Sequence, residues 1–71
     1  MHYVYVLKYR AEWYIGYTNN LVQRYRQHRK KKAWNLIYYE AYQIEKAARS
    51  RERNLKHYGS AWRALRKRIT A

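Results

Sequence analysis

The stretch YVYVLKYRAEWYIGYTNN, residues 3–20, determines how the chain begins to fold, and it holds five of the ten tyrosines. Residues 2–9 alternate around β-branched and aromatic side chains, which predicts a strand, and residues 13–18 predict a second one. The connection through residues 10–12 is short enough for an antiparallel hairpin. The sequence therefore predicts a tyrosine-rich hairpin at the start of the chain.

This hairpin predicts which tyrosines share a face. Because alternate residues of a strand point to one side, Tyr3 and Tyr5 face together, as do Tyr14 and Gly16. Across the hairpin, we expect Tyr5 and Tyr14 to lie near each other. Cross-strand aromatic packing alone explains such a pair, since the chain has ten tyrosines and no phenylalanine. Gly16 weakens a strand unless another group must approach its backbone closely.

The middle of the chain predicts a helix and a third strand. Residues 21–31 contain good helix formers. At residues 29–32, RKKK, the end of this helix is expected to fray into a basic loop. Residues 36–42, LIYYEAY, predict a strand that is central in the sheet and well buried. The N-cap candidates for the helix are Thr18, Asn19 and Asn20.

The last third of the chain predicts two more helices. One runs from Ile44 to about His57, with Gly59 placed to cap its C-terminus. Ser60 then caps the other helix. The order β-β-α-β-α-α predicts an α+β fold, in which residues 1–71 form a single small domain with a three-stranded antiparallel sheet flanked by helices. The apolar face of the last helix is expected to contain Ala61, Trp62, Leu65 and Ile69.

Length and composition limit the class of protein. A chain of 71 residues buries only roughly 60% of its unfolded surface, so the core is thin. Cysteine is absent, which excludes disulfides and thiolate zinc sites and fits a reducing compartment. The sequence has neither an apolar run long enough to span a membrane nor a signal-peptide pattern, so we expect a cytoplasmic protein.

Charge is the strongest indication of a partner. Seventeen Lys and Arg residues oppose four Glu, and the formal net charge is +13. This charge favours nucleic acid, because phosphate contacts release counterions. An anionic membrane is a weaker alternative, and a basic structural or ribosome-associated protein is the simplest one. So few acids disfavour a nuclease built on a carboxylate cluster with two metals, and leave at most one carboxylate to hold a metal.

Three further residues are candidates for chemistry. Arg24 and His28 share a helix face, which an ordinary solvated basic face also explains. Glu52 lies at the edge of the apolar stripe of the second helix. A half-buried carboxylate needs a partner, so Glu52 either holds a metal or forms an ion pair with Lys56, one turn further on.

These residues occur in the order of a known family. The sequence resembles the GIY-YIG nuclease domain, in particular the small stand-alone bacterial type that is similar to the N-terminal domain of excinuclease C. YVY at 3–5 corresponds to the first motif, with Tyr3 in place of its glycine, and YIG at 14–16 is the second motif, intact. GYTNNLVQRYRQH at 16–28 and ARSRERNLK at 48–56 look like the segments that carry the family's arginine, histidine and glutamate.

The resemblance implies a β-β-α-β-α fold and metal-dependent cleavage of DNA, usually with Mg²⁺ and alternatively with Mn²⁺. Carried over to this chain, Glu52 would hold the metal. Tyr5 and Tyr14 would flank the scissile phosphate and bring in the attacking water. Arg24 would neutralise the charge that grows on the phosphate, and His28 would assist through a hydrogen bond or proton transfer.

The general base is open at this point. Free tyrosine has a pKa of about 10, which is too high for neutral pH. Nearby cations could lower this pKa, and the chain supplies many. We favour Tyr5 as the base, with Tyr14 in a positioning role.

We expect low or structure-based specificity, because the 71 residues hold no additional DNA-binding domain and a protein partner could supply the target. SAWRALRKR, residues 60–68, also lacks an asparagine that some members of the family carry. Interleaved Tyr and Trp side chains could stack unpaired bases and favour single strands or flaps over duplex, although core packing is expected for Trp62. The residues expected to contact DNA are Arg26, Arg29, Lys30, Lys31, Lys32, Arg49, Arg53 and Lys56.

Two classes of function remain in competition beside the simple basic protein. One is a small magnesium-dependent endonuclease. The other is a non-catalytic nucleic-acid-binding module that uses the same basic surface and carries a dead site. The presence of all five candidate residues favours the endonuclease.

Overall fold

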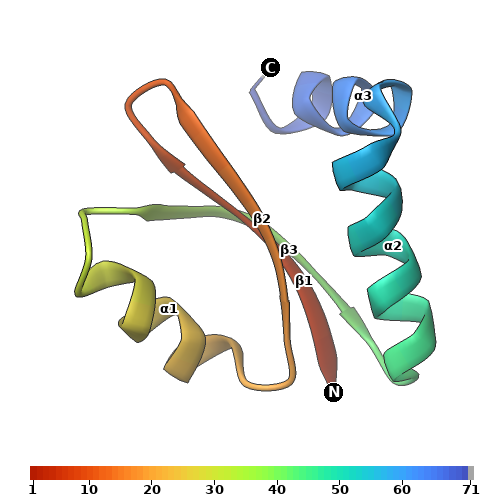
Figure 1. Ribbon diagram of the computed structural model, residues 1–71, viewed down its shortest axis with the longest axis horizontal. Coiled ribbons are helices and arrows are strands. Elements are labelled where there is room, and N and C mark those ends of the chain that lie inside the picture. Colours follow the sequence, from red (N-terminus) through yellow and green to blue (C-terminus); the bar gives the residue numbers. More distant parts are fainter. Residues whose placement is uncertain (71) are drawn as a thin grey trace.

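The computed structural model describes residues 1–70. Its three strands form one antiparallel sheet, with α1 on one face and α2 and α3 on the other (Figure 1). This architecture confirms the predicted α+β fold and element order. Within residues 1–70, no helix is long and apolar enough to cross a membrane. The elements are β1 (His2–Tyr9), β2 (Glu12–Thr18), α1 (Leu21–Arg29), β3 (Asn35–Tyr42), α2 (Glu45–His57) and α3 (Gly59–Ile69).

The sheet has the order β2-β1-β3, so β1 is its central strand. Residues 4–7 of β1 are at most 1% exposed, because helices cover both faces of this strand. The prediction that residues 36–42 form a central, well-buried strand is wrong. β3 lies at the edge, and its residues alternate between exposed and half-buried. Tyrosine and isoleucine are common on both the exposed and the covered side of such a strand, so the sequence of β3 does not reveal which of its residues are exposed.

The sheet divides the core into two layers. Val4 and Val6 of β1 pack toward α2 and α3, whereas Tyr5 and Leu7 pack toward α1 together with Trp34. Alternate residues of one strand therefore serve opposite layers. The predicted apolar face of the last helix is confirmed, and its tryptophan packs against a tryptophan of β2 with ring centroids 5.3 Å apart. The residues of this face are Ala61, Trp62, Leu65 and Ile69.

The helix ends confirm one prediction and correct two. Asn20 caps α1, and its side chain accepts a hydrogen bond from the backbone N–H of Gln23. At the junction of α2 and α3, Tyr58 has an extended backbone with φ −115° and ends one helix while it begins the next. Gly59 is the first residue of α3 and has no positive φ, and Ser60 lies inside that helix. The predicted caps are wrong because one extended residue is enough to redirect the chain.

A half-buried carboxylate joins β3 to α2. Glu40 accepts hydrogen bonds from the hydroxyls of Tyr38 and Tyr42 and from the guanidinium of Arg51. Burial raises the pKa of Glu40, but these three donors outweigh it and leave the pKa below its ordinary value. Arg51 directly precedes Glu52, so this network fixes the part of α2 that carries the candidate metal ligand.

Gly16 is pressed against two tyrosines. It pairs with Tyr5 in the hairpin, and a Cβ atom at this position would lie 2.5 Å from the Tyr5 hydroxyl oxygen and 2.8 Å from Cε1 of Tyr14. The two rings have centroids 6.1 Å apart, which confirms that they lie near each other across the hairpin. Gly16 therefore serves a close approach of side chains rather than an unusual backbone conformation.

Gly16→Ala is expected to lower the free energy of unfolding by about 1–3 kcal/mol, because the added methyl group must displace the buried Tyr5 ring. Gly59→Ala is the matched control. Nothing lies within 4 Å of a Cβ atom at Gly59, and alanine favours a helix, so this variant is expected to be neutral or more stable by up to about 1 kcal/mol. Urea unfolding measures both variants, and equal effects at the two glycines would contradict the close approach.

Candidate active site

The five candidate residues meet at the β2 edge of the sheet, between α1 and α2. Tyr14, Arg24 and Glu52 line one cavity of about 480 Å³, here called the polar cavity. Tyr5 and His28 adjoin it through Tyr14, whose ring centroid lies 6.1 Å from that of Tyr5 and 4.7 Å from that of His28. The structure thus brings all five together. The polar cavity is lined by Tyr14, Tyr17, Thr18, Asn19, Arg24, Glu45, Arg49 and Glu52.

A hydrogen bond joins the central strand to α1 at this site. The hydroxyl oxygen of Tyr5 lies 2.8 Å from Nε2 of His28. Burial lowers the pKa of His28 below its usual 6.5, and Arg24 and Lys31 lower it further. A neutral imidazole that carries its proton on Nδ1 accepts this bond from the tyrosine O–H. With this tautomer, Nε2 of neutral His28 is the acceptor and the Tyr5 hydroxyl is the donor of the hydrogen bond.

Tyr5 itself resists ionisation. Burial is the largest cause that raises the pKa of its hydroxyl above the usual value, and the neighbouring Tyr14 adds to the shift. Arg24 acts in the opposite direction but is outweighed. A nearby cation therefore does act to lower the pKa of Tyr5, but its effect is smaller than that of burial and the net shift is upward. As a result, Tyr5 can accept a proton readily only if its own proton leaves at the same time.

Glu52 has the ion pair that the sequence offered as its simplest explanation. Nζ of Lys56 lies 3.1 Å from Oε2 of Glu52, whose side chain is 21% exposed. Within residues 1–70, no group of three or more potential His, Cys, Asp or Glu metal ligands comes together. Mg²⁺ usually keeps several waters and takes only one or two carboxylates beside substrate phosphates. The wall of the polar cavity carries two carboxylates, Glu45 and Glu52, so its donor set fits such an ion.

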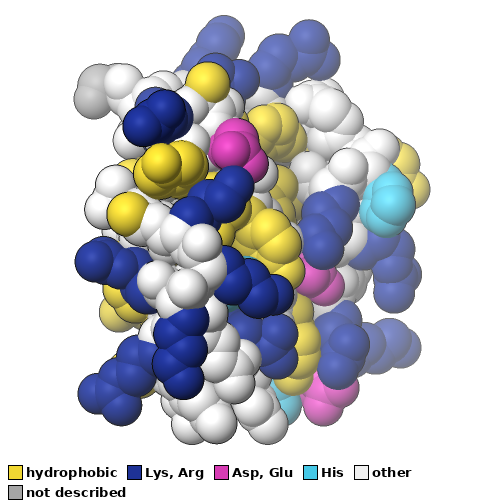
Figure 2. All heavy atoms as spheres, turned by 60° about the vertical axis from the view of Figure 1, so that its left-hand side comes forward, with side chains coloured by type: hydrophobic (Ala, Val, Ile, Leu, Met, Phe, Trp, Pro, Cys, Tyr) yellow, Lys and Arg dark blue, Asp and Glu magenta, His cyan; other side chains and the backbone are white. Residues whose placement is uncertain are grey.

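The cations predicted to bind DNA differ in their surroundings. Arg49 lines the polar cavity, donates to Glu45 and lies over the ring of Tyr17, 4.3 Å from its centroid. Lys32 is bonded to Glu12 on the hairpin. Figure 2 shows Lys and Arg side chains over much of the face that includes α1, with few acidic side chains among them. The other exposed members of the set are Arg26, Arg29, Lys30, Lys31, Arg53 and Lys56.

Four residues that line the polar cavity were not predicted from the sequence as site residues: Tyr17, Thr18, Asn19 and Glu45. Glu45 lies seven residues before Glu52, so helical periodicity places both on one face of α2 and could have found it. Tyr17 is held by a contact of 2.8 Å between its hydroxyl and Nδ1 of His2. Strand alternation puts Tyr14 and Tyr17 on opposite faces of β2. No local pattern shows that both border one cavity, because the cavity lies at the edge of the sheet.

Comparison with known proteins gives one match. The family model of the GIY-YIG catalytic domain matches residues 1–68, nearly the whole chain. No curated protein and no solved structure matches the chain significantly. The family consists of nucleases, which are generally endonucleases and generally depend on a divalent metal. The hairpin with its two motifs, the order of the elements and this match lead to one conclusion: the chain belongs to the GIY-YIG catalytic domain family.

Proposed function

We propose that the chain is a metal-dependent endonuclease that hydrolyses DNA phosphodiester bonds with low or structure-based sequence specificity. Membership of a nuclease family supports this activity, and the net charge of +13 suits a DNA substrate. The observation that carries the proposal is the meeting of five side chains from three parts of the chain beside one polar cavity. These side chains are Tyr5, Tyr14, Arg24, His28 and Glu52.

Glu52 is the residue proposed to hold Mg²⁺ or Mn²⁺. When bound, the divalent ion supplies positive charge beside the scissile phosphate and the leaving oxygen. Lys56 now neutralises this carboxylate. Once released from Glu52, its ammonium group is free to contact a phosphate of the DNA.

Arg24 and Tyr14 are proposed to position the phosphate. The guanidinium of Arg24 borders the polar cavity, and its planar set of donors suits two phosphate oxygens at once. As negative charge grows on these oxygens, such donors stabilise the transition state more than the ground state. Tyr14 packs on His28 and borders the same cavity, so it limits where the phosphate can lie.

The Tyr5–His28 pair is proposed to move the proton of the attacking water. The water oxygen bonds to phosphorus, its proton passes to the Tyr5 oxygen, and the Tyr5 proton passes to Nε2 of His28. The bond from phosphorus to the leaving oxygen breaks, and that oxygen takes a proton from solvent. Tyr5 never has to exist as a free anion, so its raised pKa does not prevent the reaction.

One observation favours the second candidate, a non-catalytic nucleic-acid-binding module. The ion pair of Glu52 with Lys56 gives the carboxylate a partner from its own chain. A site that had lost its chemistry would keep this pair for stability alone, and the basic surface would still bind DNA. The two candidates therefore differ in whether Glu52 is needed for cleavage.

Glu52→Gln is expected to reduce metal-dependent cleavage by on the order of 100-fold or more, because it removes the proposed metal ligand. Binding measured in EDTA should remain or become slightly tighter, since one negative charge is lost. Glu12→Gln makes the same charge change on the hairpin, outside the polar cavity, and should keep most of the activity. The assay uses labelled single-stranded, duplex and flap DNA with Mg²⁺, Mn²⁺ or EDTA. Salt-sensitive binding without cleavage of any substrate would support the binding module instead.

Cleavage is also expected to fall at acid pH. The pKa of His28 lies below 6.5, so His28 is neutral above that pH and becomes unable to accept a proton as the pH falls through its pKa. His28→Gln should be slower by on the order of 100-fold and should lack this acid limb in kcat/KM. His57→Gln, at the exposed end of α2, is the control and should keep the limb. An acid limb that persists in His28→Gln would contradict the role of this residue.

A further inference from the structure

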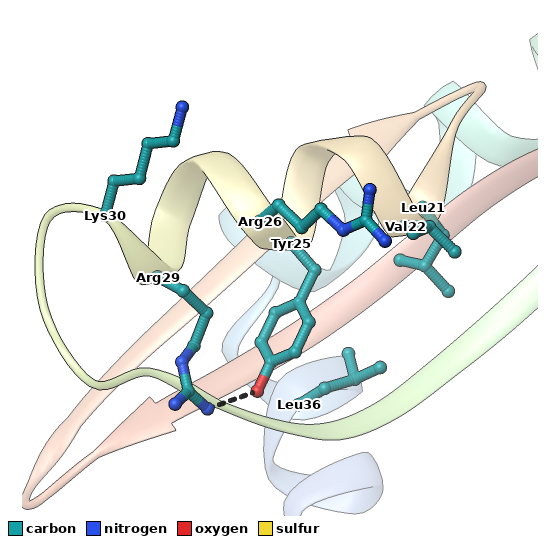
Figure 3. A pocket seen from close by; sticks show the side chains of 7 residues that line it. All are labelled: Leu21, Val22, Tyr25, Arg26, Arg29, Lys30 and Leu36. Atoms are coloured by element: carbon teal, nitrogen blue, oxygen red, sulfur yellow. Dashed lines mark hydrogen bonds between the residues drawn. The ribbon is translucent and has the colours of Figure 1, made fainter.

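A larger pocket lies on the other side of α1 and contains none of the five site residues. We call it the α1–β3 pocket; its volume is about 720 Å³, which is in the range of ligand sites. Most of its wall is apolar, three cations complete it, and no carboxylate lines it (Figure 3). Val22 in this wall is 62% exposed, so the core of the protein does not account for it. The lining residues are Leu21, Val22, Tyr25, Arg26, Arg29, Lys30 and Leu36.

The pocket is preformed around Tyr25. The hydroxyl of Tyr25 donates to the backbone carbonyl of Trp34 at 3.0 Å, and Arg29 donates to the same hydroxyl at 3.2 Å. Figure 3 shows the ring pointing from α1 toward Leu36 on β3. Two hydrogen bonds therefore hold the hydroxyl end of the ring before any ligand arrives. The binding of a flat group against this wall would need little ordering of the protein.

The α1–β3 pocket and the candidate active site are on two sides of one helix. Arg24 and His28 lie on the side of α1 toward the active site, whereas Val22 and Arg26 line the pocket. An α-helix with its side chains is about 10–12 Å across. A DNA strand that passes through the active site can therefore reach the pocket within a few nucleotides.

We propose that the α1–β3 pocket takes an unpaired base of the DNA substrate, with the adjoining phosphates on Arg26 and Lys30. This inference rests on the proposed function and narrows the substrate to DNA with a single-stranded segment near the cleaved bond. A nucleotide joins a flat, largely apolar base to an anion, and the pocket joins an apolar wall to a cationic rim. A base that is paired and stacked in a duplex cannot enter it.

An acidic amphipathic peptide of a protein partner has similar chemical groups. The DNA is favoured because the same helix contributes to both sites, so one ligand accounts for both without a second partner. A strand held at the active site also has a high effective concentration at a pocket one helix width away.

The test is the binding of duplex DNA with a labelled single-stranded overhang, measured by fluorescence anisotropy in EDTA. Bases of the overhang are replaced one at a time by an abasic sugar. Binding is expected to weaken by about 10-fold at one or two adjacent positions and little elsewhere. Val22→Glu places a carboxylate in the pocket and should abolish this position dependence. Ala64→Glu adds the same charge on the exposed side of α3 and should keep the dependence, at a lower overall affinity.

Several results would overturn the proposal. The first is an overhang that binds equally well at every abasic position. The second is a position dependence that survives Val22→Glu, because the base would then bind elsewhere. The third is a loss of the position dependence in both Val22→Glu and Ala64→Glu, which would show that the dependence reflects overall charge and not the pocket. Specific binding of an acidic peptide, blocked by Val22→Glu and unaffected by overhang DNA, would assign the pocket to a protein partner.

This assay requires no cleavage, so it separates the inference from the proposed function. If the wild-type protein cleaves DNA but shows no position dependence, the proposed endonuclease activity stands and the proposed base pocket is wrong. If it shows the position dependence but cleaves no DNA, the proposed base pocket stands and the proposed endonuclease activity is wrong. Circular dichroism of the two Glu variants establishes that both are folded before binding is compared.

Discussion

The packing of the Tyr5 ring against Gly16 is the contact on which the rest of the structure depends. Tyr5 lies on the central strand, is 1% exposed and belongs to the core layer beneath α1. Its hydroxyl nevertheless reaches His28, so the same side chain belongs to the core and to the candidate site. Only a residue without a side chain leaves room for this ring. Gly16 of the YIG motif and Tyr5, the second tyrosine of the YVY motif, therefore depend on each other.

Burial shifts the pKa values of Tyr5 and His28 more strongly than the neighbouring charges do. The pKa of Tyr5 is raised and that of His28 is lowered, and burial is the largest cause of both shifts. Both groups are therefore neutral near pH 7, with the hydroxyl as donor and the imidazole as acceptor. In the proposed function, the many surface cations attract DNA from a distance, whereas the Tyr5–His28 pair determines where a proton can go.

Much of this arrangement could be predicted from the sequence, because it follows from local rules. Strand alternation and a short connection placed Tyr5 beside Tyr14, and helical spacing placed Arg24 beside His28. The edge position of β3 could not be predicted, because residues 36–42 do not indicate whether one or two other strands will pair with them. The net direction of the Tyr5 pKa shift could not be predicted for a similar reason. Burial is its largest cause and depends on how α1 packs over the sheet, whereas the sequence shows only the charges.

The most direct test of this account is the initial rate of metal-dependent DNA cleavage by Tyr5→Phe. The variant keeps the ring against Gly16 and removes only the hydroxyl, so it should fold as the wild type does. Tyr3→Phe, two residues earlier on the same strand, is the matched control and should cleave normally. We predict a loss on the order of 100-fold or more for Tyr5→Phe, as for removal of a group that transfers a proton. A folded Tyr5→Phe variant that cleaves at the wild-type rate would contradict the account.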